Sequence, residues 1–176
     1  MAQKIMAWSK CKIEIGLIPA EGDPTLTDIG TILNNSSSLS SEVGNTMQMI
    51  ATGGEVVAEE EQEGTVQLVT TVIEPTSSLM TLLGIASSDD IKTHVVDGAW
   101  KVKLTPKNVG ARGISAPNCS IVYQPAWSEE NGNQAILTFK FHKTDAGVWY
   151  SYFTKAAPAQ SGGGSGGSGG SGGGEG

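Results

Sequence analysis

The sequence predicts an all-β protein, a β-sandwich or partly closed barrel of about seven strands, with one short helix and a long protruding hairpin. Three observations support this fold class. Apolar and polar residues alternate along several segments, as in strands with one buried face. Turns rich in Gly, Pro, Asn and Asp separate these segments. Helical spacing of apolar residues occurs in one segment, residues 76–84.

The first predicted strand is Lys10–Ile18, where Cys, Ile and Leu side chains alternate with Lys, Glu and Gly. A loop with two prolines follows it, and Thr25–Leu33 is expected to form a short strand.

The most unusual segment is a predicted hairpin over about residues 39–74. Two β-favouring arms, Leu39–Thr52 and Glu55–Ile73, are separated by Gly53-Gly54, a pair that can supply the positive φ angles of a tight turn. At about 3.3 Å per residue each arm could extend roughly 40 to 60 Å, so we expect the hairpin to overhang its own domain. Its apolar tip would then require folding back or a partner. The tip residues are Met47, Met49, Ile50, Val56 and Val57.

One short helix is expected at Thr76–Gly84, with Ser77 or Ser78 as the N-cap and Gly84 at the end. Strand patterns then return up to residue 154. We expect strands at Val95–Val96, Trp100–Thr105, Cys119–Gln124, Ala135–Phe141 and Val148–Thr154, with a loop at Pro125–Asn133.

The composition indicates one β domain over residues 1–158 and a flexible tail over 159–176, which is almost entirely Gly and Ser. Charged residues interrupt the first 18 residues before an apolar run of signal-peptide length can form, and the sequence has no membrane-spanning run. We therefore expect a soluble chain made in a cytoplasm, with no membrane partner. Cys11 and Cys119 are expected to be buried free thiols.

Charge is divided along the chain. No Lys or Arg lies between Lys12 and Lys92, whereas 13 acidic residues do. From Lys92 to Lys155 eight basic residues outnumber four acidic ones. The simplest interpretation is a solvated acidic surface. The alternative is head-to-tail association, in which the acidic part of one subunit meets the basic part of the next, and such contacts make rings or filaments.

The sequence offers no catalytic set, so we expect a protein that is not an enzyme and has no cofactor. The two histidines, His94 and His142, have no metal ligands at suitable spacing. Glutamates at 59, 60, 61 and 63 lack the interspersed turn residues of a calcium loop. Specific nucleic-acid binding is disfavoured because the chain is acidic and has one arginine, Arg112.

The order and spacing of several segments resemble the tail tube (major tail) proteins of long-tailed bacteriophages. The likeness spans most of residues 1–158. The segments that carry it are Leu26–Gly30, Gly53–Val57, Gly64–Leu68, Val72–Pro75, Ser78–Gly84, Gln134–Phe139 and Asp145–Tyr150.

The resemblance implies a virion structural protein, located in the phage tail and assembled in the bacterial host cytoplasm. Hexameric rings would stack into a tube with an electronegative lumen, through which DNA passes transiently at ejection. Partners would be other copies of the chain and other tail proteins. The candidate inter-ring interface residues are Met47, Met49, Ile50, Gly53, Gly54, Val56 and Val57, and the candidate lumen or acidic-interface residues are Glu14, Glu42, Glu55, Glu59, Glu61 and Glu63.

Three alternatives remain open from the sequence. The chain could be the inner tube subunit of a contractile tail or tailocin. It could be a surface adhesin or pilin-like β-domain, which Ser- and Thr-rich strands favour and the missing export signal opposes. A small enzyme on a β-sandwich is opposed by the missing catalytic set.

Overall fold

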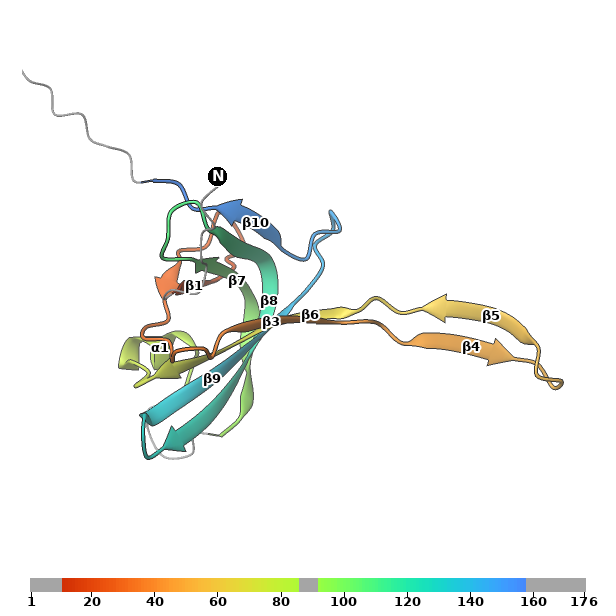
Figure 1. The fold of residues 1–176 in the computed structure, drawn as a ribbon, viewed down its shortest axis with the longest axis horizontal. Helices are drawn as coiled ribbons and strands as arrows, with labels where there is room; N and C mark the ends of the chain where they lie inside the picture. Colours follow the sequence, from red (N-terminus) through yellow and green to blue (C-terminus); the bar gives the residue numbers. More distant parts are fainter. Residues whose placement is uncertain (1–10, 86–91, 158–176) are drawn as a thin grey trace, which may run out of the picture.

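The structure is a computed structural model that describes residues 11–85 and 92–157 (Figure 1). The described residues form ten strands and one helix. The first six strands are β1 (Lys12–Leu17), β2 (Thr27–Asp28), β3 (Ser38–Glu42), β4 (Thr46–Ile50), β5 (Val56–Glu61) and β6 (Thr65–Ile73). They are followed by α1 (Ser77–Leu82), β7 (His94–Thr105), β8 (Arg112–Ser128), β9 (Gly132–Phe141) and β10 (Ser151–Thr154).

Eight strands form one antiparallel sheet that bends over itself into two layers, which confirms the predicted sandwich-like all-β fold. The strand order is β2-β1-β7-β8-β9-β6-β3, and β10 also pairs with β8. The long β8 belongs to both layers because its start pairs with β10 and its remainder pairs with β9. A register shift against β7 marks the bend, where Pro117 and Asn118 have no register partner.

The core lies between the two layers and uses the inward faces of β1, β6, β7, β8 and β9, together with residues of α1. In β1, Ile13 and Ile15 are completely buried, as the alternation predicts. Predicted inner-face residues of β9 are likewise buried. The largest fully buried side chains also include Trp100, Tyr123, Phe139, Leu68, Ile121 and Leu137. In this core β6 and β9 lie side by side, and the hairpin extends from β6 away from the body.

The helix occurs where predicted, but its N-cap is Thr76 rather than Ser77 or Ser78. The Thr76 hydroxyl accepts a hydrogen bond from the Leu79 N–H at 3.2 Å. The chain is still extended at Thr76, so Thr76 has the backbone geometry of an N-cap, while Ser77 and Ser78 are already helical. Gly84 ends the helix as expected, with φ +69°, and the N–H groups of Gly84 and Ile85 close a Schellman motif.

The predicted loop Pro125–Asn133 is correct only at residues 129–131, because β8 continues to Ser128 and β9 already begins at Gly132. Pro125 lies beyond the part of β8 that pairs with β7, because β7 begins at His94 opposite Tyr123, so Pro125 has no register partner in β7. The predicted strand Val148–Thr154 shortens to Ser151–Thr154, and Thr25–Leu33 contains only the two residues of β2 and a bridge at Ile32. The predicted tail, 159–176, lies outside the described residues.

Two further findings concern the whole described chain. Cys11 and Cys119 are both free, and Cys119 is buried whereas Cys11 is half-buried. No helix in residues 11–85 or 92–157 is long and apolar enough to cross a membrane.

Candidate assembly surface

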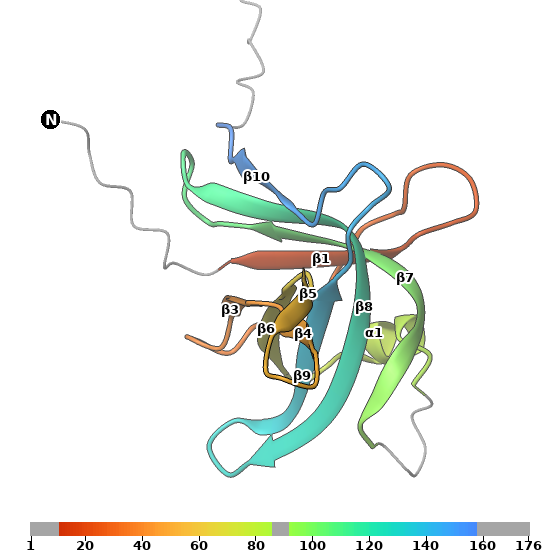
Figure 2. The ribbon, with the colours of Figure 1, turned by 90° about the vertical axis from the view of Figure 1, so that its right-hand side faces the viewer.

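The predicted hairpin is present and protrudes from the body; we call residues 38–73 the arm. At its base β3 pairs with β6, and beyond that β4 and β5 pair only with each other as a separate two-stranded ribbon. Figure 1 shows this ribbon projecting away from the body, and Figure 2 views it end-on. Each predicted arm strand is interrupted once, at residues 43–45 and 62–64. Every residue of the tip ribbon, β4 and β5, is exposed, so no other described element covers either face of it.

The two interruptions form a waist at which the strands approach closely. Gly44 lies directly against the Gln62 backbone, and Gly64 lies against the Glu42 carbonyl, so that a Cβ at either glycine would overlap a backbone oxygen. The Gln62 N–H donates to the Asn45 carbonyl oxygen at 2.9 Å and joins the two strands at the waist. Glycine is required here for close approach and not for a positive φ.

In the turn at the far end of the arm, only one of the two predicted glycines has a positive φ angle. Gly54 has φ +84°, whereas Gly53 does not lie in the positive region. The N–H groups of Gly53 and Gly54 both donate to the Ala51 carbonyl oxygen, at 2.7 and 3.0 Å. Ala51 in turn donates to the Glu55 carbonyl oxygen at 2.8 Å, which closes the ribbon.

The predicted apolar tip residues are all exposed, on both faces of the tip ribbon. Register pairs place Met47 and Met49 on one face, and Ile50 and Val56 on the other. Val57 lies at a bulge between them. The exposed fractions are 57% for Met47, 66% for Met49, 59% for Ile50, 46% for Val56 and 62% for Val57. A free two-stranded ribbon is at best marginally stable, and this one exposes its apolar groups to water.

The predicted acidic residues do not form one surface. Five of the six lie on the arm, and among the described residues Glu42, Glu55, Glu59 and Glu61 form no ion pair. Glu63 is paired with Lys143, which follows β9, so this contact ties the arm to the body. Both groups are largely exposed, so the contact contributes little stability.

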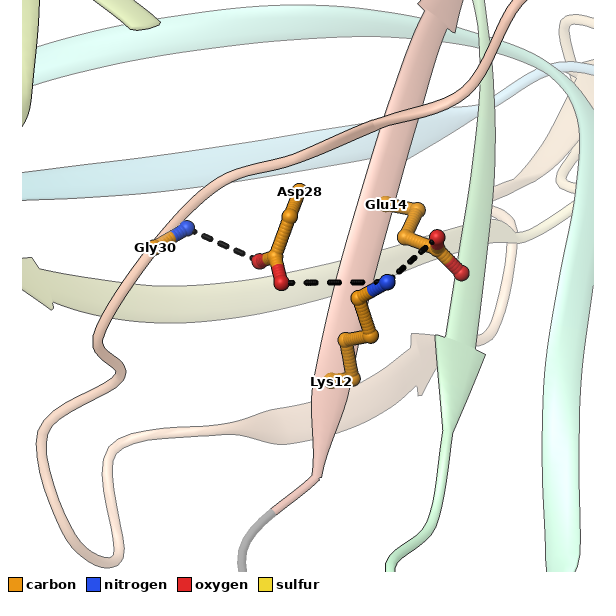
Figure 3. Close-up of polar contacts among 4 residues, drawn as sticks. All are labelled: Lys12, Glu14, Asp28 and Gly30. Carbon is orange, nitrogen blue, oxygen red and sulfur yellow. Dashed lines mark hydrogen bonds and ion pairs between the residues drawn. The ribbon is translucent and has the colours of Figure 1, made fainter.

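Glu14 lies on the body and is separate from the arm (Figure 3). Its carboxylate accepts a hydrogen bond from the Lys12 Nζ at 2.7 Å, and Asp28 lies 3.8 Å from the same Nζ. The hydrogen bond to Glu14 raises the pKa of the Lys12 ammonium. Asp28 also accepts the Gly30 N–H at 2.9 Å. The grouping of Glu14 with the arm glutamates is therefore not supported by their placement.

Sequence reasoning missed three features of the arm. Val43 is 97% exposed at the waist, and Glu60 stands opposite Met47, so the apolar and acidic parts of the ribbon overlap. The glycines at 44 and 64 were not recognised as a point of close approach between the two strands. The signal was available, because each glycine interrupts the alternation of its strand.

Within the described chain, no cluster of three or more His, Cys, Asp or Glu side chains could hold a metal ion. No protein-family model matches the sequence, and no curated protein matches it. The arm is thus the feature from which a function can be argued.

Proposed function

We propose that this protein is a structural subunit that self-assembles through its arm into stacked rings, which form a phage tail tube. The observation that carries the proposal is the tip ribbon, whose two faces are not covered by any other described element and expose five large apolar side chains. Burying a side chain of this size contributes about 1.5 to 3 kcal/mol. A neighbouring copy that covered the tip ribbon would therefore stabilise both the ribbon and the assembly.

The direction of the arm suits stacking. It projects to one side of the body (Figure 1), so that a neighbour placed along it can meet the arm with a surface of its body. Contacts between unlike surfaces give rings when the rotation closes and open stacks when it does not. Hexameric rings, their place in a virion tail and other tail proteins as partners come from the resemblance to tail tube proteins.

The acidic residues of the arm suit a passage for DNA or a contact with a basic neighbour. Four arm glutamates without an ion pair within the described chain would repel a phosphate backbone and prevent it from sticking. DNA would then pass through the tube transiently, without specific contacts, and would not be a bound ligand.

Substitution of the tip tests this proposal. We expect Met49→Glu or Val56→Glu to block assembly, because each places a charge in an apolar contact, and to leave the body folded, because neither side chain touches the core. Sedimentation velocity at raised protein concentration measures assembly, and circular dichroism reports folding. Val95→Glu is the matched control, since Val95 is 64% exposed on the body. Assembly of Met49→Glu and Val56→Glu at the wild-type level would contradict the proposal.

A further inference from the structure

We infer that the acidic arm of one copy docks on a cluster of cations at the far end of β7, β8 and β10 of the next copy. We call Lys103, Lys107, Arg112 and Lys155 the basic end. This inference rests on the proposed self-assembly and names the surface that receives the arm.

The basic end gathers residues from three separate segments. Lys103 lies near the end of β7, Lys107 in the following loop and Arg112 at the start of β8. Lys155 follows β10, which pairs with the start of β8. The Lys155 Nζ donates to the carbonyl oxygens of Pro106 and Lys107, at 2.9 and 2.6 Å, and so joins the loop to β10. The fold therefore concentrates positive charge at one end of the body.

These cations have no carboxylate partner among the described residues. Glu14 is the register partner of Lys103, but its carboxylate is bonded to Lys12. Lys103 instead lies over the Phe153 ring, with Nζ 5.2 Å from the ring centroid, and the Arg112 guanidinium lies 5.8 Å from the Tyr152 centroid. Ring contacts of this kind position a cation without neutralising it.

A glycine makes room for one of these rings. Gly113 is the register partner of Phe153, and a Cβ at Gly113 would lie 2.6 Å from the Leu104 carbonyl oxygen and would overlap the Phe153 ring. Phe153 can therefore lie flat over the strand and beneath Lys103. The positions of Lys103, Arg112 and Lys155 are thus set by the packing of β7, β8 and β10, whereas the Lys107 side chain is exposed in the loop.

The arm supplies the complementary charge. Its glutamates lie at 42, 55, 59, 60, 61 and 63, and within the described chain only Glu63 has a basic partner. Glu59 and Glu61 share a face of β5 with the apolar Val56. One face of the ribbon can therefore offer both an apolar contact and a pair of charges.

The two surfaces lie on different sides of the molecule. In Figure 1 the arm extends to the right, whereas the β7–β8 loop and the end of β10 lie at the upper left of the body. An arm therefore cannot reach the basic end of its own chain. A second copy placed along the direction of the arm can present its basic end to it, and repetition of this contact gives an open stack. Charge complementarity selects this partner and orientation.

Two charge-reversed proteins test the inference. One carries Glu59→Lys and Glu61→Lys on the arm, and the other carries Lys107→Glu and Arg112→Glu at the basic end. All four side chains are exposed, so both proteins should fold. We expect each protein alone to need about tenfold or more the wild-type concentration to assemble, because like charges then meet. An equimolar mixture should assemble again. In the mixture the arm of each protein can meet, on the other protein, residues 107 and 112 with the opposite charge.

The controls separate this inference from the proposed function. Lys140→Glu reverses an exposed charge on β9, outside the basic end, and should assemble like wild type. Wild-type protein that never assembles would overturn the proposed function itself. Wild-type assembly together with unchanged assembly of the Lys107→Glu, Arg112→Glu protein would overturn only the basic end as the receiver. If that protein does not fold, the neutral variant Lys107→Gln, Arg112→Gln replaces it. The inference would also be overturned if this neutral variant assembled at the wild-type concentration and with the wild-type dependence on salt.

Discussion

At the scale of single residues, Cys119 shows how the core controls chemistry. Its Sγ donates to the Trp100 carbonyl oxygen at 3.1 Å, and burial raises the pKa of its thiol to about 12. In an unfolded chain a cysteine has a pKa of about 8.5. Cys119 is therefore a packing residue that stays protonated in the folded protein, and not a reactive thiol.

This raised pKa predicts a loss of stability in alkali. Above about pH 9 the unfolded chain releases the Cys119 proton while the folded chain keeps it, so the free energy of unfolding falls by up to about 1.4 kcal/mol per pH unit until about pH 12. Below pH 8 Cys119 has no effect on the pH dependence. Urea unfolding at pH 7 and pH 10 should show a smaller decrease for Cys119→Ala than for wild type. Equal decreases in both proteins would show that the thiol ionises normally in the folded state.

At the scale of elements, the arm consists of a base, a waist and a tip ribbon. The base is anchored because β6 pairs with β9, whereas beyond the waist β4 and β5 pair only with each other among the described strands. The waist therefore determines where the ribbon points. Gly44 and Gly64 are the residues that permit the strands to approach closely there.

The waist leads to a prediction with an internal control. Gly44→Ala would force its Cβ into the Gln62 backbone, so we expect the ribbon to change direction and assembly to be lost. The body should lose less than about 1 kcal/mol, because the waist lies outside the core. Asn45→Ala should be tolerated, since the Asn45 side chain is exposed and only its backbone carbonyl oxygen takes part in the waist. Sedimentation and thermal unfolding compare the two variants, and equal assembly would mean that the waist does not direct the arm.

Local pattern predicted most elements because the physics behind them is local. The alternation of β1 and β9, the helix end at Gly84 and the two-armed hairpin all follow from side-chain period or turn chemistry. The continuation of β8 past Pro125 could not be seen, because it depends on pairing with β9. The separation of Glu14 from the arm likewise depends on which strands are neighbours.

At the scale of the whole molecule, the division of charge in the sequence becomes a division in space. The arm carries acidic side chains away from one side of the body, and the basic end lies on another side (Figure 1). The apolar tip adds a driving force that charge alone lacks, because hydrophobic contact does not weaken as salt screens the ion pairs. Together these features describe a subunit whose two ends are complementary to each other.

The central claim is that the arm builds an assembly from copies of this chain. Negative-stain electron microscopy of the purified protein at raised concentration, over a range of salt concentrations, tests it most directly. We predict rings, or tubes of uniform diameter with a central channel, in wild-type protein and their absence in Met49→Glu. A chain that stays monomeric at every salt and protein concentration would contradict the account.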